Sequence, residues 1–373
     1  VPAGCPADGM DRKPYTPADL YKLKRVSDQQ ISPDGKWIAF VISVTDYDEN
    51  KGNSDIWILP AKGGEPKRLT NSPKGDSHPR WSPDGETIAF LSSRGGSNQA
   101  WVIPVTGGEA EQVTDFPGGV GELEWMPDGS GFIFTGRIYP DCPDLDCITE
   151  RDDAKEERKV SAIVHRELMY RHWDTDADGK AQHLFRIGIE GGDPVDLTPD
   201  LEFDALTYWL ASAGRDFDIS PDGKMIYFSG KQAKDQAVSY NEEIWSVPVA
   251  GGEVKLVSDD PAAESHPRVS PDGKLLAWRG TRRPGYESDR YELIVMDLAS
   301  GDRRSLTSDF DRSVASFFWS HNGKKIFFQA EDRSDLNLFS VPVKGGKVTT
   351  VIGREKAGKG YHAGVQAGPN RIR

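Results

Sequence analysis

The sequence has 373 residues, enough for one large domain or two ordinary ones with a sizeable core. Hydrophobic residues make up 36% and charged residues 28%, with 39 Gly and 25 Pro, which is typical of a turn-rich chain. No apolar run reaches the length of a membrane-spanning helix, so no membrane span is expected. The net charge of −13 argues against nucleic acid as a partner and favours a cationic peptide or a free amino group.

Residues 1–30 form an N-terminal extension that leads into the first repeat. Ala3-Gly4-Cys5 within it is similar to the end of a bacterial lipoprotein signal, but no apolar stretch precedes it. A lipidated Cys5 and a plain free thiol both remain open.

An internal repeat fills residues 31–373. Ser-Pro-Asp-Gly or a close variant occurs six times, and six strand-like segments each run into Gly-Gly or Ser-Gly in phase with it. The repeat spacing is 44–50 residues, with one interval enlarged by about one period. The glycines of the six tetrapeptides are Gly35, Gly85, Gly129, Gly223, Gly273 and Gly323.

Each repeat contains four strand-like segments with apolar alternation. In the second unit these are 78–82, 87–92, 100–103 and 111–114. Pro presets φ for the turn between the first two, and Asp-Gly reverses the chain. The fold class is therefore all-β: a β-propeller with six complete four-stranded blades and the start of a seventh.

The third repeat is interrupted by an insertion at residues 137–182. The charge run 150–159 is expected to be a solvated face, and 160–171 a short helix or an extended arm. Cys142 and Cys147 lie five residues apart with no further Cys or His near enough in sequence for a metal site. We expect them to form a disulfide, which indicates an oxidising compartment.

The last residues look like the opening of a seventh unit. Gly368-Pro369-Asn370 lies near one mean repeat length after Gly323 and is similar to another hairpin turn. Stopping there would leave strand edges unpaired. The sequence is therefore expected to be a piece of a longer polypeptide.

Several segments resemble the prolyl-oligopeptidase family of serine peptidases, and among these the type-5 dipeptidyl peptidases and acylaminoacyl peptidases. They are Tyr15–Leu20, Leu23–Ser27, Met169–Thr175 with Asp178-Gly179, and Arg283–Arg290. The resemblance implies a propeller that caps an α/β-hydrolase domain carrying a Ser-Asp-His triad. No serine here lies in Gly-x-Ser-x-Gly, so the sequence contains no catalytic residues of that kind.

The resemblance implies the substrate-gating part of a secreted or periplasmic serine exopeptidase that releases dipeptides or acyl-amino acids from peptide N-termini. The expected partners are a peptide substrate and the C-terminal hydrolase domain of the same polypeptide, with a homodimer left open and no cofactor. The alternative is a non-enzymatic TolB-like envelope propeller that serves as a protein-binding platform. The reading frame beyond Arg373 distinguishes the two.

Segments in this part of the resembling propellers reach toward the active-site cavity. Glu167 is the candidate for binding a substrate α-ammonium, with Tyr170 and Arg171 framing it. A structural ion-pair cluster around Glu167 is the competing interpretation. No metal is expected, because the calcium-loop-like run Asp174-x-Asp176-x-Asp178 has Phe185 where a bidentate Glu is required.

Overall fold

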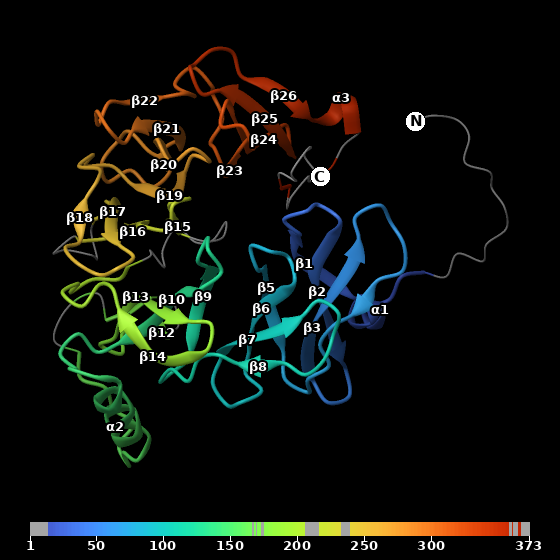
Figure 1. Cartoon of the computed structure of the whole chain (residues 1–373), viewed down its shortest axis with the longest axis vertical. Coiled ribbons are helices and arrows are strands. Elements are labelled where there is room, and N and C mark those ends of the chain that lie inside the picture. The colour runs from blue at the N-terminus through green and yellow to red at the C-terminus, as the bar shows by residue number, and fades with distance from the viewer. Residues whose placement is uncertain are drawn as a thin grey trace.

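The computed structural model describes residues 14–165, 168, 170–172, 175–205, 216–232, 239–357, 360 and 365–366. These residues form six four-stranded antiparallel sheets, each built from strands that follow one another in the chain apart from the insertion in the third. The sheets succeed one another around a ring, with the first strand of each nearest its centre (Figure 1). The predicted propeller and its six complete blades are confirmed.

The first three blades contain twelve strands. Blade 1 holds β1 (Arg25–Ile31), β2 (Trp37–Asp46), β3 (Lys51–Pro60) and β4 (Lys67–Arg68). Blade 2 holds β5 (Asp76–Trp81), β6 (Thr87–Ser92), β7 (Gln99–Pro104) and β8 (Glu111–Gln112). Blade 3 holds β9 (Val120–Trp125), β10 (Gly131–Ile138), β13 (Ala181–Gly188) and β14 (Gly191–Asp196).

The other three blades repeat the pattern. Blade 4 holds β15 (Phe217–Ile219), β16 (Met225–Gly230), β17 (Glu243–Pro248) and β18 (Lys255–Leu256). Blade 5 holds β19 (Glu264–Val269), β20 (Leu275–Gly280), β21 (Glu292–Asp297) and β22 (Arg303–Ser305). Blade 6 holds β23 (Ser316–Trp319), β24 (Lys325–Asp332), β25 (Asp335–Pro342) and β26 (Thr349–Ile352).

Three short helices accompany the strands in the part of the chain that the structure describes. They are α1 (Pro17–Lys22), α2 (Leu145–Glu156) and α3 (Arg354–Ala357), and a small hairpin of β11 (Arg171–His172) and β12 (Thr175–Asp176) lies within the insertion. In the described ranges no helix is long and apolar enough to cross a membrane.

Each Ser-Pro-Asp-Gly forms the turn between the first and second strands of a blade, as its chemistry predicts. In blade 1 the Ser32 hydroxyl donates to Asp34 Oδ1 at 2.7 Å, and the Gly35 amide donates to the Ser32 carbonyl at 2.8 Å. Gly35 has φ 69°, a left-handed conformation that glycine adopts without strain. This local satisfaction of hydrogen bonds explains why the motif recurs.

Gln366 lies beside the first blade. Its side-chain oxygen accepts from the Ile31 amide at 3.1 Å, as the Asp218 carboxylate accepts from the Val269 amide at 2.8 Å between blades 4 and 5. Gln366 therefore accepts from the last residue of the first strand of blade 1, as Asp218 of the preceding blade does from that of blade 5. This position supports the start of a seventh unit after the sixth.

The core is divided among the blade interfaces, and the one between blades 2 and 3 is rich in aromatic rings. The Phe116 ring lies 5.6 Å from that of Phe134 and 4.8 Å from that of Phe185, measured between centroids. A Cβ at Gly136 would lie 2.5 Å from the Phe116 ring. The absence of a side chain at residue 136 is therefore a packing requirement.

We expect Gly136→Ala to destabilise the protein by about 1–3 kcal/mol, because the fully packed Phe116 ring must move. The measurement is denaturant unfolding followed by fluorescence. Gly188→Ala is the matched control on the neighbouring strand β13, since the nearest atom to its added Cβ is 3.9 Å away. Equal losses in the two variants would contradict this account of Gly136.

Candidate functional site

The two faces of the ring carry different connections. The turn face carries the Ser-Pro-Asp-Gly turns, and the hairpin face carries the connections between the second and third strands of each blade. The insertion between β10 and β13 and the segment 281–291 between β20 and β21 both belong to the hairpin face. The described residues of two segments that carry the family resemblance, 170–172 with 175–179 and 283–290, therefore lie on this face.

The first strands of three blades begin with a bulge at the hairpin face. Asp28, His78 and His266 have φ of 44°, 58° and 60°, and the strand register shifts at each of them. Each lies four residues before the first residue of its blade's turn tetrapeptide, and Glu122 holds the same position in blade 3, before Met126. Bulges re-aim side chains, and Asp and His tolerate the left-handed region better than most residues. The repeat thus brings polar side chains to one level of the ring.

A cavity of about 430 Å³ opens among the bulges of blades 1 to 3. Its polar lining residues are Ser27, Asp28, Ser43, Ser54, Ser77, His78, Asn98 and Glu122. We call this cavity the mouth pocket. Hydroxyl, amide and carboxylate groups in one concave site suit a small polar or cationic ligand.

Two carboxylates, those of Asp28 and Glu122, line the mouth pocket, and Arg80 links Asp28 to a third carboxylate, that of Glu124. The Arg80 guanidinium lies 3.1 Å from an oxygen of Asp28 and 3.1 Å from Glu124 Oε1. It also donates to His78 Nδ1 at 3.2 Å, which leaves the imidazole proton on Nε2, 3.4 Å from Glu122 Oε2. Burial lowers the pKa of His78, so the ring is neutral at pH 7. The site therefore carries net negative charge, which favours a cation.

A second polar cluster lies inside blades 4 and 5. His266 Nδ1 accepts from Arg279 at 2.9 Å and lies 3.1 Å from Asp216 Oδ1, and the guanidinium of Arg279 covers the Tyr291 ring at 4.7 Å. Burial raises the pKa of Asp216 to about 6 and lowers the pKa of His266. This cluster is enclosed, and we assign it to the support of the inner strands.

The insertion begins with a helix anchored by charged side chains. The Asp144 side chain caps α2 by accepting from the Cys147 amide at 2.9 Å. Below the helix the Tyr139 hydroxyl donates to Asp152 at 2.9 Å, and Lys180 Nζ lies 2.5 Å from the same carboxylate. The helix projects from blade 3 at the outside of the ring (Figure 1).

A helix lies at 145–156, and the described residues 160–165 contain none, so the short-helix alternative is wrong for that part of 160–171. The charge run 150–159, expected to be a solvated face, forms much of the helix. Asp144 caps the N-terminal end of the helix, and Asp152 and Lys155 bind Lys180 and Tyr139. Residues 157–165 follow without regular structure, and their side chains are exposed. The extended-arm interpretation holds for this part of 160–171.

Cys142 and Cys147 form the disulfide that their spacing predicts, with S–S 2.08 Å. It closes the turn that leads into α2. Cys5 lies outside the described residues.

The predicted ammonium-binding residues are only partly described. Glu167 lies outside the described residues. Tyr170 is 42% exposed, its ring centroid is 5.3 Å from that of His165, and Arg171 Cζ is 5.9 Å from its ring. The structure therefore brings Tyr170 and Arg171 together on the exposed hairpin of the insertion.

Asp178, a residue of the calcium-like run, has other partners. It pairs with Arg137 at 2.8 Å and accepts from the Lys180 amide at 3.0 Å. In the described ranges, no group of three or more His, Cys, Asp or Glu side chains is arranged to hold a metal ion.

The mouth pocket was missed by motif reasoning. The signal was present: Asp28, His78 and Glu122 hold the same offset from successive turns. An alignment of the residues that precede each turn tetrapeptide, and not of the tetrapeptides alone, would have revealed the shared polar position.

Comparison with known proteins finds similarity to a protease propeller domain and to dipeptidyl peptidases. The Tricorn protease N-terminal beta propeller domain matches residues 51–140. Dipeptidyl-peptidase 5 of Porphyromonas gingivalis is 33% identical over 349 residues, which is 90% of this chain and 49% of that protein. Dipeptidyl-peptidase 5 of Porphyromonas endodontalis is 29% identical over 343 residues, 90% of this chain and 48% of that protein. The chain thus spans about half the length of the curated relatives it matches.

Solved structures share the fold. An acylaminoacyl peptidase in complex with Z-Gly-Gly-Phe-chloromethyl ketone has a TM-score of 0.68 at 19% identity, covering 95% of this chain and 49% of that one. The β-propeller domain of the Trilobed protease from Pyrococcus furiosus has a TM-score of 0.56 at 16% identity, covering 88% of this chain and 85% of that one.

Proposed function

We propose that this chain, a β-propeller similar to dipeptidyl-peptidase 5 proteins, is the substrate-gating part of a serine exopeptidase. The enzyme releases dipeptides or acyl-amino acids from peptide N-termini, and an α/β-hydrolase domain of the same polypeptide supplies the nucleophile. The observation that carries the proposal is 33% identity along 90% of the chain. Identity over so many blades is more specific than the shared fold.

The hairpin face is the face that we assign to the substrate. It carries the insertion with Tyr170 and Arg171, and the net negative mouth pocket with Asp28 and Glu122. A free peptide N-terminus is cationic near pH 7, so a negative potential at this face raises its local concentration. Glu167 is the proposed partner of the ammonium, and Tyr170 and Arg171 frame it.

A secreted or periplasmic location is part of the proposal. The Cys142–Cys147 disulfide supports it, because disulfides persist in oxidising compartments and are rare in the cytosol.

The test uses the complete polypeptide encoded around this chain. We expect a Gly-x-Ser-x-Gly serine followed by Asp and His beyond the propeller, and release of N-terminal dipeptides from short peptides. Gating predicts that the same enzyme leaves a folded protein with an identical N-terminal sequence uncut. A reading frame without that serine would favour the non-enzymatic binding platform, and equal cleavage of folded and short substrates would refute gating.

A further inference from the structure

Three blade junctions share one tryptophan contact. At each junction an indole Nε1 at the end of the first strand donates to a backbone carbonyl of the preceding blade, at 3.0–3.1 Å. The pairs are Trp81 to Gln30, Trp125 to Arg80, and Trp319 to Arg268. We call the contact between two successive blades a junction and name it by the blade numbers. Junctions 1/2, 2/3 and 5/6 share this contact, so their other side chains can be compared position by position.

A basic side chain crosses two of these junctions on the turn face. Lys67, opposite Ile58 in blade 1, donates to the Thr106 carbonyl in blade 2 at 3.0 Å. Arg304, opposite Val295 in blade 5, donates to the Val343 carbonyl in blade 6 at 2.8 Å. Both acceptors lie in the turn between the third and fourth strands of the next blade.

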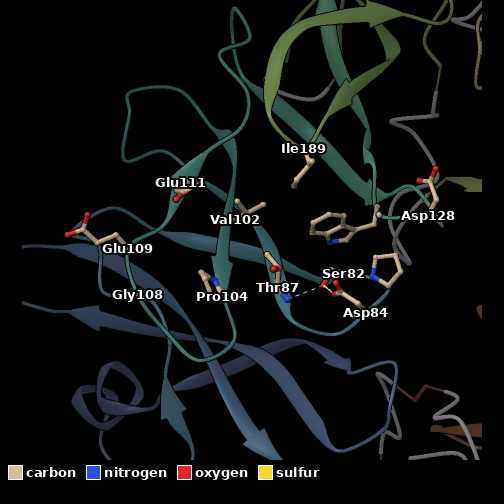
Figure 2. Close-up of a pocket in the computed structure, with 13 residues that line it drawn as sticks. Ser82, Asp84, Thr87, Val102, Pro104, Gly108, Glu109, Glu111, Asp128 and Ile189 are labelled. Carbon is tan, nitrogen blue, oxygen red and sulfur yellow. Dashed lines mark hydrogen bonds between the residues drawn. The ribbon is translucent and has the colours of Figure 1, made fainter.

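Junction 2/3 has an acidic residue at the crossing position. Glu111 lies opposite Val102 as Lys67 lies opposite Ile58, and a carboxylate cannot donate to a carbonyl. A cleft of about 640 Å³ opens there, bounded by Ile189 of the blade 3 turn (Figure 2). Ile189 occupies in blade 3 the position that Val343 occupies in blade 6. In each case the backbone amide donates to the carbonyl of the residue just before the second strand of the blade, Ser130 or Lys324. The cleft thus lies where junction 1/2 holds Lys67 and junction 5/6 holds Arg304.

The lining of this cleft suits a cationic side chain with an apolar stem. Its apolar part comes from Val102, Pro104, Trp125 and Ile189, and its carboxylates are Asp84, Glu109, Glu111 and Asp128. Ser82 and Ser130 engage Asp84 and Asp128 in the turns. Within the described part of the chain, the side chains of Glu109 and Glu111 form neither a hydrogen bond nor an ion pair. Apolar surface with adjacent carboxylates is what the stem and head of arginine or lysine require.

We propose that the cleft between blades 2 and 3 is a docking site for an arginine or lysine side chain on a segment of another polypeptide. The guest takes the place that Lys67 and Arg304 fill in their own junctions: its head lies between Glu109, Glu111 and the carbonyls of the blade 3 turn, and its stem lies along Val102 and Trp125. This site is on the turn face and is separate from the hairpin face assigned to peptide substrates.

The test is a titration of this chain with the blocked peptide acetyl-Gly-Ser-Arg-Ser-Gly-amide, followed by NMR of the tryptophan indole N–H groups. We expect the Trp125 signal to shift, while the signals of Trp81 and Trp319, in the filled junctions, stay in place. The same peptide with citrulline for arginine keeps the shape and hydrogen bonds but lacks the charge. It should bind at least about tenfold more weakly at low salt.

Two charge-reversal variants test the site: one should remove it from junction 2/3, and the other should create a similar site at junction 1/2. Glu111→Lys should supply the missing lysine and weaken binding of the arginine peptide at least about tenfold. Lys67→Glu should open junction 1/2, so that the Trp81 signal now responds to the peptide. Both positions are exposed, and the spectra report whether each variant is folded. An unmoved Trp125 signal, equal binding of the citrulline peptide, or equal shifts at all three tryptophans from diffuse attraction would each overturn the proposal.

Discussion

Replacing Glu167 by Gln in the complete enzyme is expected to lower kcat/KM for substrates with a free amino terminus by about 10- to 150-fold. The reason is the loss of a charge-assisted contact to the α-ammonium, worth about 1.5–3 kcal/mol in a partly desolvated site. The change should matter little for N-blocked substrates, which have no ammonium. Steady-state kinetics on matched free and acetylated peptides measure the difference.

Glu122→Gln is the control for this prediction, because Glu122 is the carboxylate of the mouth pocket next to the neutral His78. If Glu122→Gln and not Glu167→Gln shows the selective loss, the ammonium is bound at the mouth pocket. Equal losses on free and blocked peptides in the Glu167 variant would mean that Glu167 stabilises the insertion.

The second large effect concerns stability and pH. Glu264 lies at the start of β19, where Trp278 Nε1 donates to its Oε1 at 2.6 Å and the Ser258 hydroxyl donates to its other oxygen. Burial, with the nearby Asp260 and Asp259, raises the pKa of Glu264 to about 8, against the lowering effect of Trp278 and Arg303. Near pH 7 the folded protein therefore keeps a proton on this carboxyl.

The sign of the effect follows from linkage. The folded state keeps the proton of Glu264 up to about pH 8, whereas the unfolded state loses it near 4.5, so the unfolding free energy falls as pH rises between these values. Glu264→Gln keeps an acceptor for Trp278 and cannot ionise. We expect it to stabilise the protein at pH 8–9 relative to wild type by an amount on the order of a few kcal/mol.

Denaturant unfolding at pH 5 and pH 8.5 measures this change. The difference in stability between variant and wild type should be larger at the higher pH. Glu253→Gln is the control, since Glu253 is exposed on the surface of blade 4. A difference independent of pH would show that Glu264 ionises with an ordinary pKa.

Most of the fold was predictable because its determinants are local. The side chains of Ser32 and Asp34 form the hydrogen bonds of their own turn, so a four-residue motif is enough to predict the first hairpin of each blade. Helix α2 was not predicted, for the opposite reason. It buries only Ile148 and is anchored by Asp152 and Lys155 at Tyr139, so no apolar periodicity marks it.

The functional surface was less predictable than the blades. The mouth pocket depends on Asp28, His78 and Glu122, which lie in three different repeats and meet only because the ring places successive bulges side by side. The open cleft at junction 2/3 depends on one position: Glu111 lies there, where Lys67 and Arg304 lie in the corresponding places of blades 1 and 5. Only a comparison of the junctions with one another reveals this difference. Both are properties of assembly between repeats.

The contact between Gln366 and Ile31 has a consequence for the order of folding. It joins residues 335 apart in the chain, whereas the ladders within a blade join strands that are close in sequence. Closing a loop costs entropy that grows with its length, so blade hairpins form first and the two ends of the ring meet late. During synthesis the blades can therefore accumulate from the N-terminus, and the free edge of the first blade stays accessible to chaperones or to aggregation until residue 366 has emerged.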